Sequence, residues 1–175
     1  PSMTSPDLAP DHLIIDVHAR FKQSQRGRLP SLAHGEEEGI QAGVECGVEF
    51  ASKLDQQELT NEHFLLALLR QSDGLIRPLL EKIGIAPAAI EQQLETELAG
   101  RPRVHGGNQP FLGNELRKTI DSAEAEMTKL KDEYLSAEHY LLALLETNTP
   151  SAKFLKQAGL SNDKLIQALA AIRGN

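Results

Sequence analysis

Several kinds of residue are scarce in this sequence of 175 residues, and each scarcity excludes a class of protein. The single cysteine, Cys46, excludes an intrachain disulfide and a multi-thiolate metal site. With 18 Lys and Arg against 25 Asp and Glu, the net charge of -7 disfavours a nucleic-acid groove, which needs clustered cations. Apolar runs such as 64–69 are much shorter than the ~20 residues of a membrane-spanning helix, and no signal-like segment opens the chain. We therefore expect a cytoplasmic protein whose partners are polypeptides or small molecules, with no nucleic acid and no membrane.

Catalytic motifs are also missing. No phosphate-binding G-x-x-x-x-G-K-[ST] motif occurs, so we expect this chain neither to bind nor to hydrolyse ATP. Cys46, with His63 or His139 as its base, is the nearest approach to a nucleophile, but no Gly-rich turn surrounds it, and a small buried apolar role is expected instead. The carboxylates within 91–97 and 121–126 are typical of solvated helix faces. The sequence thus predicts no catalytic residue and no cofactor in this chain.

An internal repeat is the strongest feature that the sequence does contain. Residues 59–69 read Leu-Thr-Asn-Glu-His-Phe-Leu-Leu-Ala-Leu-Leu, and residues 135–145 read Leu-Ser-Ala-Glu-His-Tyr-Leu-Leu-Ala-Leu-Leu. Apolar residues upstream are spaced three or four apart in both copies, as one face of a helix requires. Without tryptophan, and with Leu, Ala, Glu, Gln and Lys abundant, the composition is helical. Each copy therefore begins with an amphipathic helix.

Glycine and proline mark where these helices end. Gly84 and Gly159 follow apolar helical runs, where a left-handed residue often ends a helix, and Ser161 is suited to cap the helix after it. The spacing predicts helices over 36–54, 60–71, 75–83, 87–98, 113–132, 136–146, 151–158 and 162–173, and no strands. We expect an all-α fold of two tandem four-helix repeats, packed with pseudo-twofold symmetry and leaving a groove at their junction. The predicted boundaries are 40–99 for the first repeat, 100–113 for a Pro/Gly linker and 114–175 for the second.

The Glu-His pairs that open the repeated segments have two interpretations. Thr60 and Ser136 are predicted N-caps, and Glu62 and Glu138 place negative charge at the positive end of their helix dipoles. A metal site would need ligands three or four residues apart, whereas adjacent residues point about 100° apart on a helix. We therefore predict structural caps and no metal.

Together, the two [TS]-x-E-H-x-L-L-A-L-L segments, the length of the repeat and the linker resemble the Clp N-terminal double-repeat domain. The resemblance covers about residues 40–175. Within that family, residues 74–80, 101–106 and 131–134 are most similar to the N-terminal domain of ClpB-type AAA+ disaggregases. The ClpC, ClpA and ClpV types are the alternatives.

This resemblance implies a module that captures unfolded or aggregated polypeptide, directly or through adaptor proteins, for threading by a hexameric chaperone. ATP and Mg would then belong to ATPase modules outside this chain. It also implies that Asp132 and Glu138 take part in client binding. At a third position the family has threonine and this chain has Glu37, a departure that weakens this part of the site. A standalone adaptor with one defined partner, and an enzyme hidden in the junction, are the other functions considered.

Residues 1–39 have no counterpart in the resemblance and form an N-terminal extension of unknown role. Within it, residues 11–23 show the pattern of an amphipathic helix, with Leu13, Ile14, Val17 and Phe21 on one face. The segment after it is typical of a flexible tether. One hypothesis is that the helix binds in the groove of its own or a neighbouring molecule and imitates a client; the other is a disordered tail.

Overall fold

The computed structural model describes residues 43, 45–71, 74–106, 110–132 and 135–173, and these residues are predominantly helical. The first described helix includes residues 45–53 and carries no label. The first copy continues with α3 (Asn61–Leu69), α4 (Ile76–Ile83) and α5 (Pro87–Ala99); the second contains α6 (Asn114–Lys129), α7 (Ala137–Leu145), α8 (Pro150–Gln157) and α9 (Asn162–Arg173). The prediction of repeated helical units is confirmed, with ends that differ by up to three residues from α3 onward. The expected extension, residues 1–39, lies outside the described residues.

The glycines predicted to end helices do so in both copies. Gly84 and Gly159 are left-handed, with φ of 96° and 106°. Just beyond them, the backbone N–H of Ile85 donates to the carbonyl of Leu80 at 2.8 Å, and that of Leu160 donates to Leu155 at 3.0 Å. This pattern satisfies carbonyls that the helix end would leave unpaired. The Ser161 hydroxyl accepts a hydrogen bond from the Lys164 N–H at 3.2 Å, so the predicted cap is also present.

A short parallel pair of strands is present, and the prediction of no strands is wrong here. β1 (Glu58–Leu59) pairs with β2 (Phe111–Leu112), so the end of the linker lies beside the residues that lead into α3. Two-residue strands are too short to show the alternation by which a strand is predicted. The approach is close at Gly113, where a Cβ atom would lie 2.8 Å from the carbonyl oxygen of Leu59. The long-range contact between linker and first copy therefore creates the strands.

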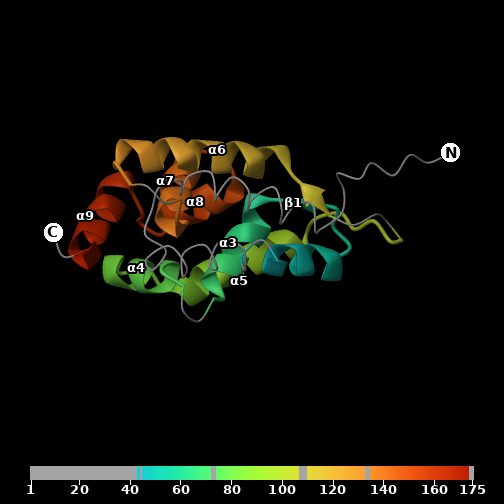
Figure 1. Ribbon diagram of the computed structural model, residues 1–175. Coiled ribbons are helices and arrows are strands. Elements are labelled where there is room, and N and C mark those ends of the chain that lie inside the picture. Colours follow the sequence, from blue (N-terminus) through green and yellow to red (C-terminus); the bar gives the residue numbers. More distant parts are fainter. Residues whose placement is uncertain (1–42, 44, 72–73, 107–109, 133–134, 174–175) are drawn as a thin grey trace.

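The helices of the two copies pack against each other (Figure 1), and apolar residues of both copies form one buried core. α4 packs against α9, α5 packs against α8, and α3 contacts both α6 and α8. Phe64 and Tyr140, which occupy equivalent positions in the repeat, meet edge to face with ring centroids 4.7 Å apart. Every residue of α3 is buried, as are all residues of α7 except Ala137. Among the described residues, no helix is both long enough and apolar enough to cross a membrane.

Candidate functional site

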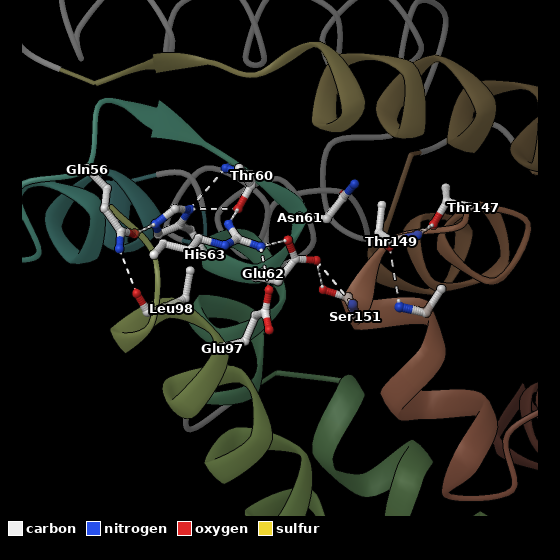
Figure 2. Close-up of polar contacts among 12 residues, drawn as sticks. Gln56, Thr60, Asn61, Glu62, His63, Glu97, Leu98, Thr147, Thr149 and Ser151 are labelled. Carbon is white, nitrogen blue, oxygen red and sulfur yellow. Dashed lines mark hydrogen bonds and ion pairs between the residues drawn. The ribbon is translucent and has the colours of Figure 1, made fainter. Parts of the chain in front are cut away.

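A buried histidine organises the start of α3. Thr60 is the N-cap residue, and its backbone N–H donates to Nδ1 of His63 at 3.0 Å. Because Nδ1 accepts this bond, Nε2 carries the ring hydrogen in neutral histidine and donates to Oε1 of Gln56 at 2.7 Å. The Gln56 amide in turn donates to the carbonyl of Leu98 in α5 at 2.6 Å (Figure 2). His63 thus takes the part of the glutamate in a capping box and ties α3 to α5.

The environment of His63 favours its neutral form. Burial and, to a smaller extent, the nearby positive charge of Arg101 lower the pKa of His63 to about 4, while Glu62 acts in the opposite direction. The side chain is 1% exposed. This histidine is therefore uncharged near neutral pH and serves as a fixed hydrogen-bonding group.

Glu62 connects three parts of the chain. One oxygen forms an ion pair with Arg101 of the linker, and the other accepts hydrogen bonds from the hydroxyl and the backbone N–H of Ser151, the latter at 3.1 Å. Ser151 lies in the first turn of α8, so the carboxylate also meets the positive end of a helix in the second copy. Figure 2 shows Glu62 between the two copies.

The repeated motif predicts Glu62 only as a partner for the dipole of its own helix, and the bridge to Arg101 and Ser151 was not predicted. Arg101 also donates to the Thr60 hydroxyl at 2.7 Å and lies 3.6 Å from Glu97. Its partner Glu62 is 39 residues away, and Ser151 is 89 residues from Glu62. No local pattern signals contacts over such separations.

The second copy repeats the histidine arrangement with a different partner. Ser136 is the N-cap of α7, and its N–H donates to Nδ1 of His139 at 2.9 Å. Nε2 of His139 lies 2.8 Å from Oδ2 of Asp132, which stands where the first copy has Gln56. The structure therefore brings Asp132 to the start of α7, directly beside the buried Glu138.

Asp132, Glu138 and His139 have ligand atoms within 4.8 Å of one another, a spacing that would suit a metal ion. A metal-binding histidine needs a lone pair on the coordinating nitrogen and usually donates its other N–H to a protein acceptor. Here Nδ1 faces the Ser136 N–H, a donor, so Nε2 carries the hydrogen. The arrangement is therefore that of a hydrogen-bonded helix start rather than a preorganised metal centre.

The other sequence-predicted residues lie in different places. Glu37, the third residue proposed for client binding, is outside the described residues. Cys46 is partly exposed rather than buried as expected. Burial and, to a smaller extent, Glu49 raise the pKa of its thiol, which disfavours the thiolate that a nucleophile requires.

A groove of about 900 Å³ lies between α5 and α8, at the junction of the two copies. Its apolar lining comes from Ile85, Ala86, Ala89, Ile90, Phe154 and Ala158, and its polar lining comes mainly from Gln92, Gln93, Thr96 and Gln157. Glu97 and Arg101 are the charged residues in the lining, and they face each other. Neither Asp132 nor Glu138 lines this groove, so the structure separates the groove from the predicted acidic residues.

The fold and these sites define a helical double-repeat module, with a groove between its copies. The model of the Clp repeat (R) N-terminal domain matches residues 39–158. The chain belongs to this family, as the repeated motif predicted.

Relatives and solved structures agree with this assignment. The chaperone protein ClpB of Mycobacterium bovis is 35% identical over 136 residues, which cover 77% of this chain and 16% of that protein. The Hsp104 N-terminal domain from Candida albicans has a TM-score of 0.64 at 22% identity, covering 76% of this chain and 87% of that one. A structure described as a peptide from the EAEC T6SS Sci1 SciI protein has a chain with a TM-score of 0.66 at 24% identity, covering 82% of this chain and 94% of its own. The two solved structures share the fold, and the chain spans about a sixth of the ClpB relative.

Proposed function

We propose that this chain is the N-terminal, polypeptide-binding module of a ClpB-like AAA+ chaperone that disaggregates proteins. The observation that carries the proposal is the open groove between the two copies of a Clp repeat domain. Similarity to chaperones named ClpB supports the assignment, as does similarity to a solved structure whose description names a peptide. ATPase modules downstream, their ATP and Mg, a hexamer, adaptor proteins and a cytoplasmic location are parts of the same proposal.

The lining of the groove suits a loosely specific polypeptide. Small and apolar side chains form a surface for apolar client residues, and the three glutamine amides can donate to and accept from any peptide backbone. The charges of Glu97 and Arg101 are already paired, so the lining selects little by charge. We expect single-site dissociation constants on the order of 10–100 µM, with avidity over six copies strengthening capture.

Asp132 and Glu138 remain a second proposed contact for clients. The Asp132 side chain is 25% exposed beside the start of α7, where its charge can attract basic segments of a client. Glu138 is 4% exposed, so its contribution to client binding would be to hold this helix start, and with it Asp132, in place. Glu37 is carried in the proposal from the family resemblance alone.

NMR titration with reduced, carboxymethylated α-lactalbumin, a permanently unfolded polypeptide, tests the groove. Ala89→Arg places a long charged side chain in the lining and should weaken binding at least about tenfold, roughly 1.4 kcal/mol. Ala88→Arg is the matched control, because Ala88 is the exposed neighbour on the same helix and is not part of the lining. Equal affinity of the two variants would contradict the groove as the binding site.

A parallel pair of variants tests the acidic contact. Asp132→Asn removes the charge but keeps an oxygen that accepts from His139, and it should weaken binding of the same polypeptide less than the double variant Asp132→Ala/Glu138→Ala. Melting temperatures must be compared first, because Glu138→Ala also removes a helix-dipole interaction of roughly 0.3–1 kcal/mol. Unchanged binding by the double variant would remove these residues from the site.

A further inference from the structure

The lining of the groove between α5 and α8 suits the apolar face of a bound helix. Its lining includes three short side chains, those of Ala86, Ala89 and Ala158, so another backbone can approach closely. Larger apolar contacts come from Ile85 and Phe154. Its volume of about 900 Å³ lies near the upper end of the ~300–1,000 Å³ of typical binding pockets. Glu97 and Arg101 are paired, so a partner with an uncharged docking face matches the lining best.

Residues 10–23 of the same chain carry such a face. Leu13, Ile14, Val17 and Phe21 recur at helical spacing, as in amphipathic helices that bind in apolar grooves. The charged residues Asp16, Arg20 and Lys22 lie away from the centre of this stripe. The segment can therefore bury four apolar side chains while the guanidinium of Arg20, at the edge of the stripe, extends to solvent.

The chain between this segment and the predicted helix at 36–54 is long enough to span much of the described domain. Residues 24–35 form a stretch of 12 residues, with an end-to-end distance of about 19 Å at roughly 5–6 Å times the square root of length. A compact body of some 130 residues has a radius of gyration of about 14 Å. Much of its surface is thus within reach of a chain of this length.

We propose that residues 10–23 bind in the groove between α5 and α8 of their own molecule and compete with polypeptide clients there. The competition rests on the proposed function, whereas the docking itself does not. The tether would hold the segment near the groove at an effective concentration of about 1 mM. With a dissociation constant of about 100 µM for the untethered segment, the segment would then occupy the groove in most molecules. Release of the segment should then raise client affinity up to about tenfold, the ratio of these two concentrations.

Backbone amide spectra of the full chain without client test the docking. Leu13→Glu/Phe21→Glu places charge in the apolar stripe and should shift the signals of lining residues such as Ala89, Gln93 and Gln157. His12→Glu/Ala19→Glu introduces two carboxylates on the opposite face and is the matched control. Equal spectra of these two variants, or no shifts in the lining, would overturn the proposal. Shifts in the lining that disappear on dilution of the unaltered chain would also overturn it, because docking would then be between molecules.

Removal of residues 1–35 gives a second test, after circular dichroism has shown that the shortened chain is helical. A synthetic peptide of residues 8–24 added to it should restore the signals of the full chain, and failure to do so would count against the docking. Affinity for carboxymethylated α-lactalbumin should rise up to about tenfold in the shortened chain. Docking signals with unchanged client affinity would overturn the competition alone. Absence of any client binding by the shortened chain would instead count against the proposed function.

Discussion

The starts of α3 and α7 share one hydrogen-bonded arrangement around a buried histidine, and comparing them shows which contacts the repeat preserves. In both, an N-cap backbone N–H donates to Nδ1 of a buried histidine, at 3.0 Å in the first copy and 2.9 Å in the second. The second ring nitrogen faces Gln56 in one copy and Asp132 in the other. The local backbone arrangement is thus conserved between the copies, while the partner of the outward nitrogen changes from a neutral amide to a carboxylate.

The two glutamates beside these histidines illustrate the same point. Glu62 is held by Arg101 and Ser151, and so joins its own copy to the linker and to α8. Glu138, the equivalent residue of the second copy, lies beside Asp132 and His139 at the start of α7. The same motif thus places its glutamate against an arginine and a helix start in one copy, and beside a second carboxylate in the other.

Glu62→Ala should have the largest effect. It leaves the partly buried Arg101 and the buried Ser151 without their shared carboxylate, and removal of one partner from a buried ion pair costs about 3–5 kcal/mol in the free energy of unfolding. Urea denaturation measures this loss. Glu97→Ala is the control, because this carboxylate faces the same guanidinium at 3.6 Å from a more exposed position and should cost less than ~1 kcal/mol. Similar losses in the two variants would contradict the bridging role of Glu62.

The pH dependence of stability should show the burial of His63. Its pKa of about 4 in the folded state is below the ordinary histidine value of 6.5, so the unfolded chain binds the proton more tightly. The contribution of this group to stability is fully present above pH 6.5 and is lost as the pH falls from 6.5 to about 4, a decrease of about 3 kcal/mol. Urea denaturation of the unaltered chain and of His63→Gln across this range measures it. An equally steep pH dependence in the variant would contradict the assignment.

Tyr140→Phe should have the smallest effect, because it removes only one hydroxyl group. The substitution makes position 140 identical to the equivalent residue of the first copy, Phe64. The lost hydroxyl donates to Oδ1 of Asn61 at 2.8 Å across the junction, and its removal leaves that buried oxygen without this donor. We expect a loss of about 1–2 kcal/mol in the free energy of unfolding. A double-mutant cycle with Asn61→Ala isolates the pair, and a coupling energy near zero would contradict this contribution.

The helices were predictable because their signals are local. Apolar spacing, the N-cap positions of Thr60 and Ser136, and the glycines at 84 and 159 all act within about one helical turn. The paired strands were not predictable, since Phe111 meets Gln57 only when the linker folds back over the first copy. The predicted groove has its counterpart at the junction of the copies, but its lining residues come from helices about 65 residues apart.

The sequence by itself determined the two helical repeats, their caps and ends, and the family to which the chain belongs. Only the tertiary structure decided what each repeated side chain meets: Arg101 and Ser151 at Glu62, Asn61 at Tyr140, and the walls of the groove between α5 and α8. The physical reason is distance along the chain. Propensity and capping depend on neighbours within a few residues, whereas a buried ion pair or a groove exists only after segments up to 89 residues apart have packed together.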